Sequence, residues 1–127
     1  MKDESKISRY LIDMKLSFEE PSKDIWLIND SDSGLEQVAV VLLDNLVIVR
    51  TTLMKVPSAK QEDFYKLLLT LNATDVIHGA YGIEKDSVIL IDTLEYDTMD
   101  FEEFRATLDS FSLSMIQHYP LLSAYRN

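Results

Sequence analysis

The sequence has no cysteine, and glycine and proline occur only three times each. Without cysteine no disulfide can form, so nothing indicates the disulfide-stapled folds of small secreted proteins. Apolar runs are short too, and none approaches the roughly 20 residues that a helix needs to span a bilayer. The first ten residues, MKDESKISRY, are polar and charged, unlike a signal peptide. We therefore expect a cytoplasmic protein that is not embedded in a membrane.

Basic residues are also scarce. Twelve Lys and Arg stand against 22 Asp and Glu, which gives a formal charge of −10. Such a surface repels nucleic acid and anionic membranes, because binding to either depends on Lys and Arg that neutralise phosphates. The apolar fraction of 46% is typical of a globular protein, and 127 residues are close to the commonest domain size. We expect one domain over residues 1–127 that binds neither nucleic acid nor membrane.

The first half of the chain predicts one helix and three strands. Apolar residues at helical spacing over 5–15 predict an amphipathic helix, which Pro21 prevents from continuing. DIWLIND at 24–30 is rich in strand formers and ends in a polar turn. Two longer runs, 37–43 and 46–54, are separated only by Asp44 and Asn45, which suit a tight hairpin turn.

The second half predicts a helix, a hairpin and a final helix. Ser58 and Gln61 fit a capping box, and Asn72 is a plausible left-handed end of the same helix. A last helix begins near Thr98 or Asp100, with Asp100 and Glu103 as a capping pair. Between the two helices we predict strands over 76–84 and 87–94, joined by a turn at Lys85 and Asp86. Pro120 should end or break the last helix.

The predicted order is α-β-β-β-α-β-β-α, which indicates an α+β fold with a mainly antiparallel sheet packed by helices. An antiparallel sheet with one solvated face should alternate apolar and polar residues, yet VAVVLL, LVIV and VILI do not. Either helices cover both faces, or another chain covers part of one. We therefore expect a homodimer or a docking surface, since large exposed apolar patches mark interaction sites.

No pattern in the sequence predicts catalysis. His78 and His118 are the only histidines; His78 falls inside a predicted strand and His118 near a helix end, so we expect structural roles. Asp92, Glu95 and Asp97 precede the last helix, where its dipole favours acidic residues. We therefore expect a protein that is not an enzyme, with no catalytic residues.

Cofactor and metal motifs are lacking as well. Asn29 to Gly34 resembles the start of a calcium loop, but the position that needs a bidentate Glu is Val40. Gly79 and Gly82 stand alone, without the phosphate-binding pattern GxGxxG or a following Lys-Ser/Thr. We expect neither a cofactor nor a metal site.

The segment LLLTLNATDVIHGAYGIEKDSVILIDTLEYDTMDFEEF, the later SMIQHYP and the order of elements resemble the YbjN family. That family shares its fold with the Tir-type (class I, CesT-like) chaperones of bacterial type III secretion. The resemblance carries over no catalytic residue. It implies a homodimer that holds or regulates a partner polypeptide through apolar surface patches, with the second helix and second hairpin as candidate dimer elements.

We predict the partner site on the first helix and first strand, at Ile7, Leu11, Met14, Trp26 and Ile28. The strand begins the sheet in sequence, which favours an edge position where a partner could add a strand. The alternative is that these residues close the core of the monomer. A different function that the sequence leaves open is a small-ligand sensor with an apolar pocket.

Overall fold

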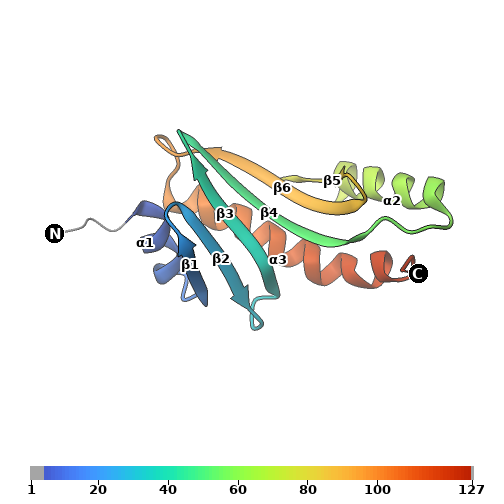
Figure 1. Cartoon of the computed structure of the whole chain (residues 1–127), viewed down its shortest axis with the longest axis horizontal. Helices are drawn as coiled ribbons and strands as arrows, with labels where there is room; N and C mark the ends of the chain where they lie inside the picture. Colours follow the sequence, from blue (N-terminus) through green and yellow to red (C-terminus); the bar gives the residue numbers. More distant parts are fainter. Residues whose placement is uncertain (1–4, 127) are drawn as a thin grey trace.

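The computed structural model describes residues 5–126, as three helices and a six-stranded antiparallel sheet (Figure 1). The elements are α1 (Lys6–Asp13), β1 (Phe18–Ser22), β2 (Ile25–Asp30), β3 (Leu35–Leu43), β4 (Leu46–Lys55), α2 (Gln61–Thr74), β5 (Ala80–Glu84), β6 (Ser87–Glu95) and α3 (Phe101–Ser123). The strands lie in the order β1-β2-β3-β4-β6-β5. The predicted α+β fold with a mainly antiparallel sheet is confirmed, with one strand more than the sequence indicated.

The extra strand is β1, which forms the edge of the sheet beside β2. Its sequence FEEPS is polar, and its register shifts between Glu19 and Ser22. Charged residues, proline and a bulge are features of edge strands, since they discourage pairing with other chains. The prediction that the segment from Ile25 to Asp30 lies at the edge was therefore wrong: β2 is paired on both sides.

Both predicted hairpin turns are confirmed. Asp44 and Lys85 have positive φ angles of 56° and 55°, at the start of the two-residue links of β3–β4 and β5–β6. The first half of the strand predicted over 76–84, however, is a loop, because β5 begins only at Ala80.

Two helix boundaries differ from the prediction. Helix α2 begins at Gln61, after Lys60 in a left-handed conformation, and continues past Asn72 to Thr74. Helix α3 contains Pro120 without ending there and continues to Ser123. At its start the predicted capping box is confirmed, because the Asp100 carboxylate accepts from the Glu103 N–H and the Glu103 carboxylate accepts from the Asp100 N–H.

The main core lies between the sheet and α3. Val38 and Val40 of β3 and Val47 and Val49 of β4 are fully buried, and so is Phe111 of α3. We call this helix-covered side of the sheet the inner face and the opposite side the outer face. In Figure 1 the strands of the sheet pass in front of α3. Helix α1 packs on α3 at one end, where Tyr10 contacts Phe101 and Phe104.

Helix α2 packs beside β5, where it joins α3 and the edge of the sheet. Phe64 of α2 is fully buried and meets the ring of Tyr125, which follows α3, in an edge contact at 5.3 Å between centroids. The Asn72 side chain accepts from the Tyr81 N–H at 2.7 Å and donates to the Tyr81 carbonyl at 3.1 Å. This amide occupies the N–H and the carbonyl of Tyr81, near the start of β5.

Candidate functional site

The residues predicted as the partner site are brought together by α1 and β2, but they face the core. Ile7, Leu11, Trp26 and Ile28 are fully buried, and Met14 is half-buried against the same cluster. As described, the arrangement agrees with the alternative that these residues close the monomer core. A partner could reach the four buried side chains only if α1 left the sheet.

A buried hydrogen bond explains why α1 lies where it does. The Trp26 indole Nε1 donates to the Ser8 hydroxyl at 2.9 Å, so the polar atom of the largest core side chain is satisfied inside the protein. Ser5 caps the helix and accepts from the N–H groups of Ile7 and Ser8. The Lys6 ammonium donates to the carbonyls of Tyr96 and Met99, which ties α1 to the start of α3. The one sequence signal for the buried hydrogen bond is Ser8, a polar residue beside the apolar side of an amphipathic helix.

The outer face of the sheet is apolar over its central strands. Ile25, Val41 and Ile48 pair in register across β2, β3 and β4, and they are only half-buried. Leu43 and Leu46 pair at the end of the β3–β4 hairpin and are more exposed still, Leu43 at 59%. Over the described residues no helix lies on this face in Figure 1. The sequence predicts strands that are apolar on both faces. In the structure, the apolar residues of one of these faces are left open.

A second exposed apolar group lies on α2 and the loop that follows it. Tyr65 and Leu69 are four residues apart on the solvent side of the helix, and Leu69 is 68% exposed. Ile77, beyond the end of the helix, is 70% exposed. This group belongs to the elements that the family resemblance implied for a dimer.

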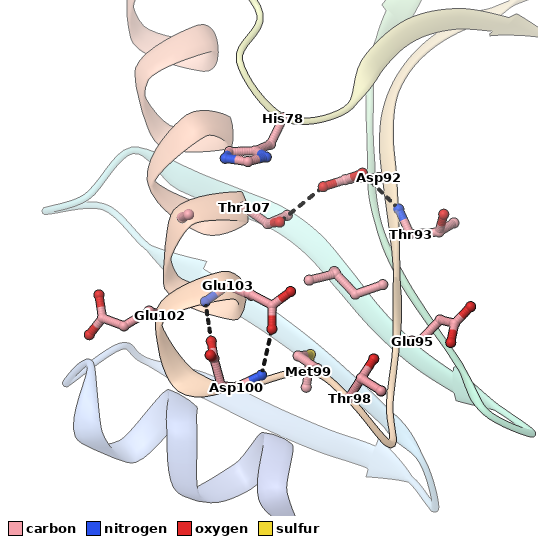
Figure 2. A pocket seen from close by; sticks show the side chains of 12 residues that line it. His78, Asp92, Thr93, Glu95, Thr98, Met99, Asp100, Glu102, Glu103 and Thr107 are labelled. Carbon is pink, nitrogen blue, oxygen red and sulfur yellow. Dashed lines mark hydrogen bonds between the residues drawn. The ribbon is translucent and has the colours of Figure 1, made fainter.

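A hollow of about 540 Å³ lies between β6 and the start of α3. Figure 2 shows the side chains that line it. It contains most of the acidic residues that precede the last helix. Asp92 accepts from the Thr107 hydroxyl and from the Thr93 N–H, both at 2.9 Å. Asp100 and Glu103 form the capping box described above. Their structural roles agree with the interpretation that these acids serve the helix.

His78 borders this hollow, but it differs from the prediction because it lies exposed in the loop before β5 and not in a strand. Ser110 of α3 anchors the loop by accepting from the His78 N–H at 3.0 Å and donating to the His78 carbonyl at 3.3 Å. Among residues 5–126 no group of three or more His, Asp or Glu side chains is arranged to hold a metal ion.

His118 is almost fully buried and links three elements. Its Nδ1 lies 2.6 Å from the Tyr81 hydroxyl of β5, and its Nε2 lies 3.3 Å from a carboxylate oxygen of Asp75, at the end of α2. Burial first, and then the charge of Asp75, raise the pKa of Tyr81 far above its usual value, so the phenol keeps its proton. The prediction of a structural role for His118 agrees with this buried position.

Comparisons with known proteins agree on family and fold. The family model CesT_Tir_1 matches residues 1–127. None of the curated proteins matches the sequence. No helix in the described part of the chain is both long and apolar enough to cross a membrane.

Two solved structures share the fold. The crystal structure of YbjN from E. coli superposes with a TM-score of 0.62 at 16% identity, covering 91% of this chain and 90% of that one. The ExsC-ExsE complex superposes with a TM-score of 0.56 at 15% identity, covering 96% of this chain and 97% of the matched one. At these identities the likeness describes the fold alone.

Proposed function

The chain belongs to the CesT_Tir_1 family, and from this premise we propose that it binds a partner polypeptide and holds or regulates it through apolar surface. The observation that carries the proposal is the open outer face, where Val41, Ile48 and Leu43 remain accessible although the sheet has a complete core on its other side. A protein of 14.6 kDa keeps such a face only at a cost in solubility unless something covers it. That a structure with this fold is a complex of two named proteins, ExsC and ExsE, supports a polypeptide as the cover.

The proposed role is non-enzymatic, in the cytoplasm. Within the described residues the buried histidine is bound on both ring nitrogens, and Asp92 is held by two hydrogen bonds. A general acid or base must instead be free to exchange a proton with a substrate. Turnover of a defined substrate that is lost in His78→Ala or Asp92→Asn, with the fold retained, would overturn this part of the proposal.

We further propose that the protein is a homodimer through α2 and the β5–β6 hairpin. Tyr65, Leu69 and Ile77 supply the exposed apolar side chains there, and a two-fold axis would set the same patch against itself. Light scattering at micromolar concentration should give twice the protomer mass of 14.6 kDa. Leu69→Arg should lower it to one protomer, and Ile12→Arg, on the exposed side of α1, is the matched control.

We keep the predicted partner site as a proposal with one added condition, that α1 moves away to expose it. Its residues are Ile7, Leu11, Met14, Trp26 and Ile28. It requires α1 to leave the sheet, which the Trp26–Ser8 hydrogen bond opposes. Met14→Glu and Trp26→Ala separate the two roles. Variants that keep the melting temperature but lose the partner support a binding role, whereas variants that unfold place these residues in the core.

The test of the main proposal is affinity purification from the cells that make the protein, with identification of what is retained. We expect one dominant polypeptide, present in a fixed ratio to the bait. A bait that returns alone, or with a changing background of abundant proteins, would contradict the proposal.

A further inference from the structure

The outer face has an apolar centre without net charge. The register of β1 to β6 places two cations on it: Lys55, at the far end of β4, and Arg50, whose guanidinium pairs with Glu84 at 2.8 Å across β6. Ile89 of β6 lies in register between the strands that carry Arg50 and Glu84 and is buried, although no helix covers it. The ion pair therefore shields one corner of the face, and Ile25, Val41 and Ile48 form the open part.

An acidic rim borders the open part at the end of the β3–β4 hairpin. Asp44 lies in the turn itself, and Glu95 of β6 pairs in register with Leu46. Asp97 is fixed beside the turn because its N–H donates to the Asn45 side chain at 2.8 Å. All three acids are exposed, and none belongs to an ion pair with another described residue. Exposed Leu43 and Leu46 thus stand beside three unpaired carboxylates.

Parts of both sheet edges are poor sites for an added strand. At one edge β1 contains Pro21, which has no N–H to donate, and the charged Glu19 and Glu20. At the other, the Asn72 amide occupies both backbone groups of Tyr81. Among the described residues, β6 has no partner strand on its β5 side beyond Ile91, so these features close the edge only along β1 and at Tyr81. The open face is the extended apolar surface that the sheet offers a partner.

We propose that the outer face docks an amphipathic helix of the partner polypeptide, with its apolar side on Ile25, Val41 and Ile48 and with Lys or Arg at the end that reaches Asp44, Glu95 and Asp97. A helix is the element that packs on a sheet face in two- and three-layer folds, as α3 does on the inner face. The unpaired carboxylates complement a basic helix and disfavour an acidic one. This inference rests on the proposed function, because it names the chemistry of the polypeptide and where it binds.

The test uses the full protein and a designed helical peptide of about 18 residues, long enough to cross the four central strands. Its apolar positions are Leu at helical spacing and its polar positions are Lys. A second peptide carries Gln in place of every Lys. Isotope-labelled protein is titrated with each, and the amide shifts that change are mapped by NMR. We expect the Lys peptide to shift amides of β2, β3, β4 and the end of β6, and to bind about ten-fold more tightly than the Gln peptide at low salt.

Variants locate the site independently of the spectra. Ile48→Arg places a charge at the centre of the face and should weaken the Lys peptide about ten-fold, since the new cation would be buried beside the peptide. Thr93→Arg, on the exposed partner of Ile48 in β6, should do the same without removing an apolar side chain. Leu113→Arg, at an exposed position of α3, adds the same charge elsewhere and should leave binding within about two-fold. Unchanged melting temperatures show that each variant is folded.

Two results would overturn the inference. One is a set of shifts confined to α1 and β1 or to α2, and the other is Lys-peptide affinity that Ile48→Arg and Thr93→Arg leave unchanged. Its failure can be told from that of the proposed function. If Thr93→Arg still retains the polypeptide from the source cells, the protein binds a partner elsewhere; if the unmodified protein retains none, the proposed function fails as well.

Discussion

The hydroxyl of Tyr81 lies 2.6 Å from Nδ1 of His118, inside the protein where β5 meets α3. Burial, and then the charge of Asp75, raise the pKa of Tyr81, so the phenol that meets the imidazole is protonated. On the other side of the ring, Nε2 lies 3.3 Å from a carboxylate oxygen of Asp75. One imidazole thereby joins β5, α3 and the end of α2.

The first prediction concerns this junction. Tyr81→Phe removes the hydrogen-bond partner of a buried ring nitrogen, and we expect a loss of about 1–3 kcal/mol in the free energy of unfolding, measured with urea. Tyr65→Phe, on the exposed side of α2, should change stability by less than about 0.5 kcal/mol. Equal stability of Tyr81→Phe and the parent would show that the hydrogen bond contributes nothing.

A second prediction tests the contact of Asn72 with β5. Asn72→Ala should lose about 1–3 kcal/mol, because the Tyr81 backbone loses partners for both its N–H and its carbonyl. Hydrogen exchange of the Tyr81 amide should accelerate by about ten-fold for every 1.4 kcal/mol lost. The control, Thr70→Ala on the exposed side of α2, should leave the exchange rate unchanged. Undiminished protection of the Tyr81 amide in Asn72→Ala would contradict the bidentate arrangement.

The glycines of HGAYG provide a third, paired prediction. Gly79 has a φ of +94°, and a Cβ atom there would lie 2.8 Å from the Ile91 carbonyl oxygen. Gly82 has room, with Ile89 Cγ1 at 3.8 Å from the added atom. Gly79→Ala should therefore cost about 2 kcal/mol or more, and Gly82→Ala less than about 1 kcal/mol. Equal melting temperatures for the two variants would contradict the described path of this loop.

A fourth prediction concerns acid stability. The Asp30 carboxylate accepts from the Ser17 N–H at 2.9 Å and from the Ser33 N–H at 3.1 Å, and these bonds, led by the one from Ser17, lower the pKa of Asp30. A lowered pKa means that the contribution is complete above the unfolded value of about 3.9 and is lost as the pH falls through the folded value.

Asp30→Asn should therefore destabilise the protein by about 1 kcal/mol at pH 7 and flatten the fall in stability below about pH 4. Asp32→Asn, in the same turn and exposed, serves as the control. Stability should be measured from pH 7 to about pH 2.5, the range in which carboxylates titrate. Parallel curves for Asp30→Asn and the parent would show that the lowered pKa of Asp30 does not contribute to stability.

The hairpins were predictable because their signal is local: a two-residue polar link lies between two apolar runs. Asp44 tolerates the positive φ that such a turn needs, and Lys85 adopts it in the second hairpin. The capping box of Asp100 and Glu103 was predictable for the same reason. Strand β1 was not, because FEEPS has no strand pattern of its own and is held by its pairing with β2.

The candidate site was harder to predict, because burial depends on what lies opposite a residue. The apolar stripe of α1 has the same sequence pattern whether it faces a partner or the sheet. Its buried position is seen only in contacts between distant parts of the chain, such as the Trp26–Ser8 hydrogen bond. The helix that continues through Pro120 likewise depends on its packing, since Leu122 beyond the proline is buried. The open face, by contrast, was indicated by strands apolar on both sides, although the sequence did not say which side is open.

The most direct test of the central claim, that this protein binds a partner polypeptide, is native mass spectrometry of the protein purified gently from the cells that make it. The account predicts a mass above one or two protomers of 14.6 kDa by several kilodaltons, which is released as a polypeptide on denaturation. A mass that matches the protomers alone would contradict it. An excess of a few hundred daltons would also do so, and would identify the protein as a small-ligand sensor.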